Sequence, residues 1–207
     1  MSSVWDLRAR LYDVCEGSTL RRGPAKSTLF RDMEGRILFV AVGTGVDIAQ
    51  FPPGRRIVAV DISNEMLRRA ERRQKRYNGD LKLVEADAMD LTFLDASFDM
   101  AVTSCTFCSV PDPVRALREL YRVLRPGGKL LMIEHVRSRN TIFGLTLDLM
   151  TLWTRRLGTE MNRDTVSNVL KAGFEITSID SVYLDIILAI RGRKPRSAIS
   201  SVEECHE

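Results

Sequence analysis

The sequence predicts an α/β protein built on a doubly wound sheet of seven mostly parallel strands, with helices on both faces. Between residues 37 and 190, short apolar runs alternate with amphipathic segments, which is typical of parallel strands joined by crossover helices. The first run ends in the glycine-rich turn Gly43-Thr44-Gly45, which fits the crevice edge of such a sheet. No helical segment separates the last two runs, so we expect an antiparallel last strand.

The predicted strands are short apolar runs that end at polar or glycine residues. A run that is apolar on both faces fits a strand covered by helices on both sides. Parallel strands are predicted at residues 37–42, 57–60, 81–86, 98–103 and 129–133, and a closing pair at residues 174–179 and 185–190.

The predicted crossover helices have one apolar face and recognisable ends. The segment 64–77 can begin at the N-cap Ser63 and stop at Asn78-Gly79. A second helix begins at Asp112-Pro113, a cap followed by a first-turn proline, and stops at the Pro-Gly-Gly sequence of residues 126–128. Weaker periodicity predicts helices near residues 145–153 and 166–170.

The length of 207 residues is enough for one well-buried core, so we expect a single domain over residues 1–193. Within it, residues 1–35 show no strand pattern and are predicted to form an N-terminal helical lid. The polar segment 194–207 is predicted to be a disordered tail.

Composition narrows the location and the partners. The apolar stretches are far shorter than the roughly 20 residues that cross a bilayer, and the charged N-terminus does not fit a signal peptide. We therefore expect a cytoplasmic protein whose four cysteines are reduced. The net charge of +4 is too small to indicate nucleic-acid binding, and the basic run 68–76 is read as a solvated helix face without interleaved aromatics. The oligomeric state has no signature in the sequence.

Three successive predicted strands end at residues suited to one ligand, because the carboxyl ends of parallel strands meet at the same edge. The glycine turn lets the backbone approach closely, but Ile48 stands where a dinucleotide-binding turn has its third glycine. Asp61 can accept hydrogen bonds from ribose hydroxyls, and Asp87 can accept from an adenine amine, with the Ala88 N–H beside it. A nucleoside with an amino-acid tail, the shape of S-adenosylmethionine, fits better than a dinucleotide.

Together these motifs resemble those of the class I S-adenosylmethionine-dependent methyltransferases, which have a Rossmann-like fold. The matching segments are residues 37–45, 60–61, 85–88, 97–99 and 117–128, so the resemblance covers about residues 35–135. It implies an enzyme that uses S-adenosylmethionine as its cofactor. The cofactor-binding residues that it implies are Val42, Gly43, Gly45, Asp61, Ile62, Asp87, Ala88 and Ser104.

Two positions depart from the family pattern. Phe39 stands where the family has an acidic residue that helps to fix the amino-acid end of the cofactor, so other residues must do this here. Ala41 stands where the first glycine is usual, which costs little as long as its φ angle is negative. The departures leave open a non-catalytic cofactor-binding module. A nicotinamide-dependent oxidoreductase is another alternative, which Ile48 disfavours.

The methyl acceptor would meet residues at the same crevice. Tyr12 and His135 are the candidate catalytic residues, and Glu134 and the loop 104–109 are further candidates for acceptor contact. His135 can equally be a buried residue that ties a loop, and Tyr12 can belong to a helix cap. The pair Cys105 and Cys108 lacks the four ligands of a zinc site, so no metal is expected.

Residues 105–111 and 132–138, with Tyr12-Asp13 upstream, resemble small bacterial phosphatidylethanolamine N-methyltransferases. They are also similar to quinone C-methyltransferases and alkyl-thiol S-methyltransferases. The resemblance implies a small-molecule or lipid acceptor that is hydrophobic or membrane-associated. The N-terminal segment has a basic face that can adsorb to anionic lipid, formed by Arg8, Arg10, Arg21, Arg22 and Lys26. We therefore expect the lid to contact the inner face of the membrane.

Overall fold

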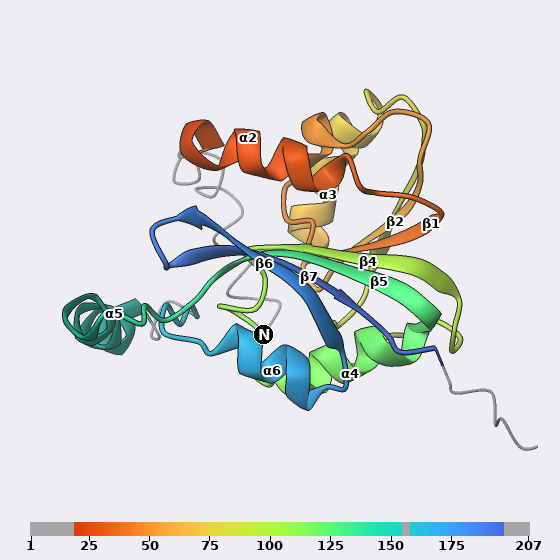
Figure 1. The fold of residues 1–207 in the computed structure, drawn as a ribbon. Helices are drawn as coiled ribbons and strands as arrows, with labels where there is room; N and C mark the ends of the chain where they lie inside the picture. Colours follow the sequence, from red (N-terminus) through yellow and green to blue (C-terminus); the bar gives the residue numbers. More distant parts are fainter. Residues whose placement is uncertain (1–18, 155–157, 197–207) are drawn as a thin grey trace, which may run out of the picture.

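A computed structural model describes residues 19–154 and 158–196 of the chain. Its centre is a seven-stranded sheet in the order β3-β2-β1-β4-β5-β7-β6 (Figure 1). The strands are β1 (Arg36–Val40), β2 (Arg56–Asp61), β3 (Asp80–Glu85), β4 (Phe98–Ser104), β5 (Leu124–His135), β6 (Glu175–Tyr183) and β7 (Ile187–Arg193). Strands β1 to β5 pair in parallel, whereas β7 is antiparallel to both β5 and β6. The predicted Rossmann-like fold with an antiparallel last strand is confirmed.

Helices cover both faces of the sheet. In Figure 1, α2 (Thr19–Phe30) and α3 (Asn64–Gln74) lie on one side, and α4 (Pro113–Val123) and α6 (Thr165–Lys171) lie on the other. A short 3-10 helix, η1 (Val46–Gln50), follows the glycine turn, and α5 (Thr141–Thr154) lies beyond the carboxyl ends of the central strands. None of the described helices is long and apolar enough to cross a membrane.

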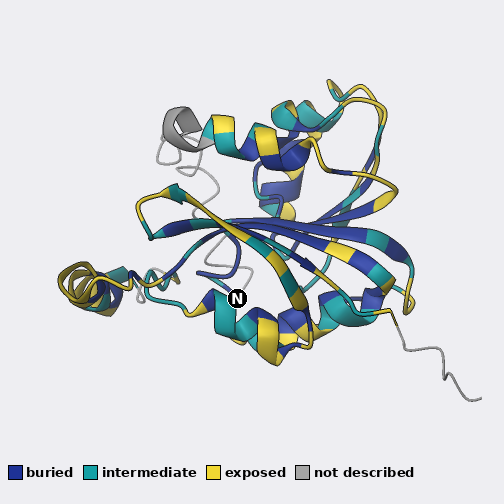
Figure 2. Cartoon of the chain, in the orientation of Figure 1, coloured by how far each residue is buried: buried dark blue, intermediate teal, exposed yellow. Residues whose placement is uncertain are grey.

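Alternate residues of β1 enter two different cores. Ile37 and Phe39 belong to the cluster under α2 and α3, whereas Leu38 and Val40 belong to the cluster under α4 and α6. All four are buried, as the dark ribbon of the central strands shows in Figure 2. This explains why the run is apolar at every position, because both faces of a central strand are covered.

The predicted helix caps are confirmed. The Ser63 hydroxyl accepts a hydrogen bond from the Met66 N–H at 3.2 Å, and the Asp112 carboxylate accepts from the Arg115 N–H at 2.9 Å. Pro113 follows as the first residue of α4. These local signals could be found from sequence because a cap needs only residues three positions apart.

Several element ends differ from prediction. β1 ends at Val40, because Ala41 turns to a φ of 57° and leaves the extended conformation. α3 ends at Gln74, since Tyr77 leaves the helix to donate from its hydroxyl to the Pro52 carbonyl at 2.6 Å. β5 begins at Leu124, so the Pro-Gly-Gly sequence lies inside the strand, where the Gly127 N–H donates to the Lys194 carbonyl at 2.9 Å. Lys194, which the sequence assigned to the tail, therefore contacts the sheet.

Candidate functional site

The glycine turn joins β1 to η1 at the carboxyl edge of the sheet. Gly43 and Gly45 have φ angles of 56° and 81°, a region that favours glycine. The Gly45 N–H donates to the Val42 carbonyl at 2.9 Å, and the Ile48 N–H donates to the Gly45 carbonyl at 3.0 Å. A Cβ on Gly45 would lie 2.7 Å from Cδ1 of Ile48 and 3.1 Å from Cβ of Ala70, so packing as well as φ disfavours a side chain at this position. Ile48 therefore fills the space that a third glycine would leave open.

Ala41 begins this turn with a positive φ of 57°, so the condition under which alanine would cost little here is not met. A Cβ in the left-handed region lies too close to the backbone, which costs roughly 1–2 kcal/mol. The turn keeps the shape that glycine adopts in this position, although the residue is alanine.

Asp61, at the end of β2, links the glycine turn to α3. Its carboxylate accepts from the Gly43 N–H at 2.8 Å and from the Ser63 N–H at 3.0 Å. Asp61 is buried, with 8% of its surface exposed. A carboxylate can accept about four hydrogen bonds, so one engaged by backbone N–H groups can also accept from a ribose hydroxyl. Ile62, between Asp61 and the cap Ser63, is half-buried.

Asp87 lies one strand further along, in the loop after β3. Its carboxylate accepts from the Met89 N–H at 2.8 Å, and both Asp87 and Ala88 are half-buried. The Ala86 N–H donates to the Asp61 carbonyl at 3.0 Å, which joins the β2 and β3 ends. The structure thus places the two predicted acids on neighbouring strand ends.

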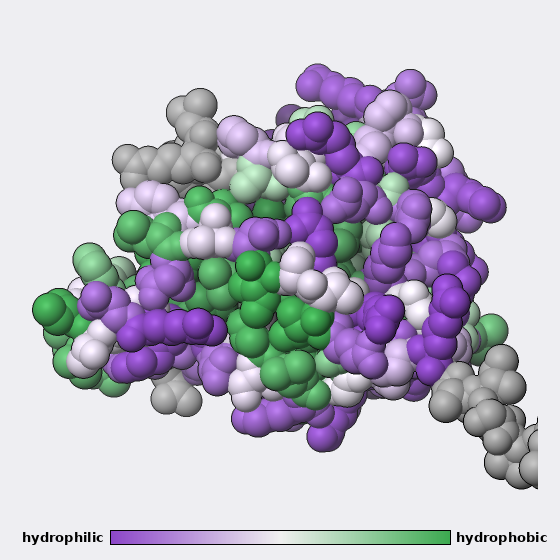
Figure 3. Space-filling view, viewed as in Figure 1, coloured by the Kyte–Doolittle hydropathy of each residue, from purple (hydrophilic) through white to green (hydrophobic). Residues whose placement is uncertain are grey.

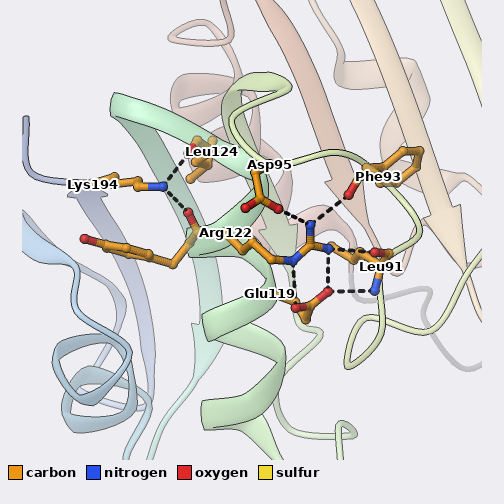
Figure 4. Close-up of polar contacts among 8 residues, drawn as sticks. Leu91, Phe93, Asp95, Glu119, Arg122, Leu124 and Lys194 are labelled. Atoms are coloured by element: carbon orange, nitrogen blue, oxygen red, sulfur yellow. Dashed lines mark hydrogen bonds and ion pairs between the residues drawn. The ribbon is translucent and has the colours of Figure 1, made fainter.

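Helix α4 holds the loop after β3 from outside (Figure 4). Arg122 donates to the Leu91 carbonyl at 2.7 Å and to the Phe93 carbonyl at 2.8 Å, while Glu119 accepts from the Leu91 N–H at 2.9 Å. The hydrogen bond from Arg122 lowers the pKa of Glu119. Earlier in the same helix, Arg115 donates to the Met89 carbonyl at 3.0 Å. Glu119 and Arg122 of the 117–128 motif therefore fix the backbone of the loop that carries Asp87. Sequence reasoning missed this role.

Glu134 is fully buried and is not placed to contact an acceptor, which corrects the expectation for it. It accepts from the Thr103 hydroxyl at 2.7 Å and from the N–H groups of Thr106 and Phe107 at 3.1 and 3.0 Å. Burial raises the pKa of Glu134 to about 7. The side chain shapes the loop after β4, where Cys105 has a φ of 53°.

Ser104 ends β4 at the level of the glycine turn, because β4 pairs in register with β1 up to Val40 and Thr103. Its hydroxyl is buried and finds no hydrogen-bond partner among the residues that the structure describes. A buried hydroxyl without a partner is costly, so this one fits a site completed by a polar ligand. With Asp61 and the glycine turn, it suits a nucleoside that has an amino-acid tail.

Cys108 donates from its thiol to the Cys105 carbonyl at 3.3 Å, and burial raises the pKa of that thiol. Within residues 19–154 and 158–196, no group of three or more histidine, cysteine or acidic side chains is arranged to hold a metal ion. The CxxC pair thus has a packing role in the loop.

Phe39 lies in an aromatic cluster instead of facing a charge partner. Its ring centroid is 4.8 Å from that of Phe51 and 5.9 Å from that of Phe30. Close by, the Lys26 ammonium of α2 donates to both carboxylate oxygens of Asp47 in η1, at 2.7 and 3.0 Å. Both partners of this ion pair are buried. The prediction that Lys26 belongs to a basic surface was therefore wrong. The pair fixes α2 beside the glycine turn.

The candidate catalytic residues are only partly placed. His135 is half-buried at the end of β5, opposite Ile187 of β7, and so lies at the carboxyl edge of the sheet as predicted. Tyr12 lies outside the described residues, as do Arg8 and Arg10 of the predicted basic face. The side chains that sequence reasoning missed, Lys26, Asp47 and Arg122, act over long separations in the chain.

Known methyltransferases are similar to this chain in sequence. Residues 38–132 match a family model described as a methyltransferase domain. A demethylmenaquinone methyltransferase of Thermus thermophilus is 36% identical over 146 residues, covering 68% of this chain and 65% of the relative. A phosphatidylethanolamine N-methyltransferase of Cereibacter sphaeroides is 34% identical over 103 residues, covering 49% of this chain and 51% of the relative. The chain thus spans between half and two thirds of these relatives.

Solved structures share the fold. A methyltransferase of Thermotoga maritima, described as a possible histamine N-methyltransferase, has a TM-score of 0.67 at 24% identity, over 92% of this chain and 99% of that one. The [4+2]-cyclase SpnF has a TM-score of 0.68 at 19% identity, over 84% and 80% of the two chains. Residues 38–132 therefore match a methyltransferase domain, and the fold is that of S-adenosylmethionine-dependent methyltransferases. S-adenosylmethionine is the cofactor that this family and fold imply.

Proposed function

We propose that the protein transfers a methyl group from S-adenosylmethionine to a hydrophobic or membrane-associated acceptor, with the amine of phosphatidylethanolamine as the first candidate. The proposed binding of S-adenosylmethionine is supported mainly by the Asp61 carboxylate, which is buried between the glycine turn and α3. Similarity to a phosphatidylethanolamine N-methyltransferase supports the lipid amine.

The bound cofactor supplies an electrophilic methyl group whose sulfonium is already a good leaving group. The chain then has to align the acceptor and exclude water, which are the main contributions a protein makes to such a displacement. Gly43 and Gly45 allow close backbone approach, and Asp61 and Asp87 orient the nucleoside. Glu134 keeps the loop after β4 in one shape through its three hydrogen bonds.

An amine acceptor must lose a proton before or during methylation. His135 is the described group that we assign to this step, because it lies at the carboxyl end of β5 and imidazole titrates near neutral pH. Tyr12 is the second candidate for contact with the acceptor.

A quinone ring carbon is the second candidate acceptor. The demethylmenaquinone methyltransferase similarity extends over more of this chain than the phosphatidylethanolamine similarity, at 68% against 49%. A thiol acceptor and a cofactor-binding module without activity are the remaining alternatives. SpnF, described as a cyclase, shows that the fold serves other chemistry.

The deciding experiment follows a labelled methyl group from S-adenosylmethionine into purified phosphatidylethanolamine, demethylated quinone and alkyl thiol, each dispersed in neutral detergent. We expect label in the phospholipid, recovered as methylated ethanolamine after hydrolysis. The Asp61→Ala variant is the control for cofactor-dependent transfer. Label in the quinone or in a thioether would instead identify a quinone carbon or a thiol as the acceptor. Tight cofactor binding without transfer to any of the three would contradict the proposal and favour the binding module.

A further inference from the structure

Helix α5 exposes an apolar surface that the other helices and strands of the described residues do not cover. Ile142, Leu145, Leu149 and Leu152 are between 60% and 75% exposed, and Phe143, Met150 and Trp153 are also exposed. In Figure 1 the helix lies apart from the helices on the two faces of the sheet, and green apolar atoms mark its place at the edge of Figure 3. Large apolar side chains gathered on one surface element mark a site of interaction.

The exposed side chains follow helical spacing and make one broad face. Residues 142, 145, 149 and 152 lie along one line of the helix, and residues 143, 150 and 153 extend it sideways. At about 100° per residue, the apolar arc covers roughly half of the circumference. The opposite side is packed onto the protein through Gly144, Leu147 and Thr151, so the exposed face is held in a fixed orientation.

The charges around the helix suit an anionic surface. Asp148 is the one acidic residue in α5, and its carboxylate accepts from Arg137 at 2.9 Å and from Asn162 at 3.0 Å. Arg139 precedes the helix and is exposed, and Arg155 and Arg156 follow Thr154 in the sequence. Arg139 is thus a described cation beside an apolar face whose one acid is already paired, and the sequence after the helix is also basic.

The width and length of this face distinguish a bilayer from a partner helix. A seam for a second helix is narrow and bordered by polar residues, whereas here Thr146 is the single polar side chain within the exposed arc. The helix has 14 residues, about 21 Å, which is too short to cross a bilayer but suits a helix lying flat at the headgroup boundary. Exposed Phe143 and Trp153 are residue types that occupy that boundary.

We propose that α5 docks this protein on an anionic lipid bilayer, with its apolar face immersed at the boundary between headgroups and acyl chains. The docking would hold the carboxyl edge of the sheet at the membrane, because α5 follows β5 after only five residues, 136–140. The connecting segment is itself fixed, since the Ser138 hydroxyl donates to Asp185 at 2.8 Å. This binding goes beyond the proposed function, because it does not depend on which acceptor is methylated.

The test is flotation of the full chain with phosphatidylcholine vesicles that contain or lack phosphatidylglycerol. The double variant Leu145→Glu/Leu149→Glu puts two charges on the apolar face, and Leu94→Glu is the matched control, because Leu94 is 82% exposed outside α5. We expect the unmodified chain and the control to float with anionic vesicles. The double variant should lose at least roughly tenfold in partitioning.

Three outcomes would overturn the docking proposal. One is that the unmodified chain fails to bind anionic vesicles, and another is that the double variant binds as well as the control. The third is a dimer in solution, without vesicle binding, that the double variant converts to a monomer, which would assign the face to a second copy. Circular dichroism and cofactor titration establish that both variants fold. Methyl transfer to detergent-dispersed acceptors is measured without vesicles, so loss of docking and loss of the proposed activity are separable.

Discussion

The Asp61 carboxylate accepts a hydrogen bond from the Gly43 N–H at 2.8 Å, so the acid that follows β2 also shapes the turn that follows β1. Asp61→Ala should therefore weaken S-adenosylmethionine binding by about 1–3 kcal/mol, through lost ribose contacts and a loosened turn. Isothermal titration measures this directly. Asp61→Asn keeps one carbonyl acceptor, so its dissociation constant should lie between those of the unmodified chain and of Asp61→Ala. An unchanged dissociation constant for Asp61→Ala would place the ribose elsewhere.

Ala41→Gly should stabilise the protein, because glycine adopts the φ of 57° without the clash that alanine has there. We expect the free energy of unfolding to rise by about 1 kcal/mol in urea denaturation. Ala101→Gly, in the buried interior of β4, is the control and should lower it. A loss of stability for Ala41→Gly would mean that the turn is not strained at this residue.

Lys26→Met should destabilise the fold by roughly 3–5 kcal/mol, since Asp47 would remain buried without its cation. The double variant Lys26→Met/Asp47→Leu should recover much of this loss, because no buried charge then remains. Thermal unfolding of the unmodified chain, the two single variants Lys26→Met and Asp47→Leu, and the double variant gives the coupling energy of the pair. Arg193→Met, which breaks the exposed pair with Glu175, should cost less than about 1 kcal/mol. Equal effects of Lys26→Met and Arg193→Met would contradict the account of a buried pair.

Glu134 should make the protein less stable as pH rises from about 4.5 to about 7. The native state keeps the proton of Glu134 up to a pKa of about 7, whereas the unfolded chain loses it near the ordinary glutamate pKa of 4.5. More protons are bound in the native state over this range, so the free energy of unfolding falls with pH, by up to about 3 kcal/mol.

The measurement is urea denaturation of the unmodified chain and of Glu134→Gln at several pH values between 4 and 8. The difference between the two curves isolates the titration of Glu134, because the other ionisable groups are common to both proteins. Parallel curves over this range would show that Glu134 ionises in the native state as it does in the unfolded chain.

The elements that the sequence predicted well are those with local signals. The caps at Ser63 and Asp112 depend on residues three positions away, and the strand runs depend on neighbours within a few residues. The carboxyl-end positions of Asp61 and Asp87 followed from the order of strands alone, because parallel strands bring these ends to one edge.

The features that could not be predicted depend on contacts between distant parts of the chain. Lys26 and Asp47 are 21 positions apart, and Thr103 and Glu134 are 31 positions apart. Lysine, aspartate and glutamate are rarely fully buried without a partner, so their burial could not be expected before these partners were known. The φ of Ala41 is set by the surrounding turn and not by alanine, so no local preference could indicate it.

The place of β7 between β5 and β6 has a consequence for synthesis of the chain. β6 pairs with the sheet only through β7, although it is made first. A nascent chain that has left the ribosome as far as Tyr183 therefore has a complete run of β1 to β5, but its sixth strand lacks β7, the strand with which it pairs. Residues 187–193 must therefore be translated before β6 can reach its native place, so we expect this edge of the sheet to form after β1 to β5 have paired.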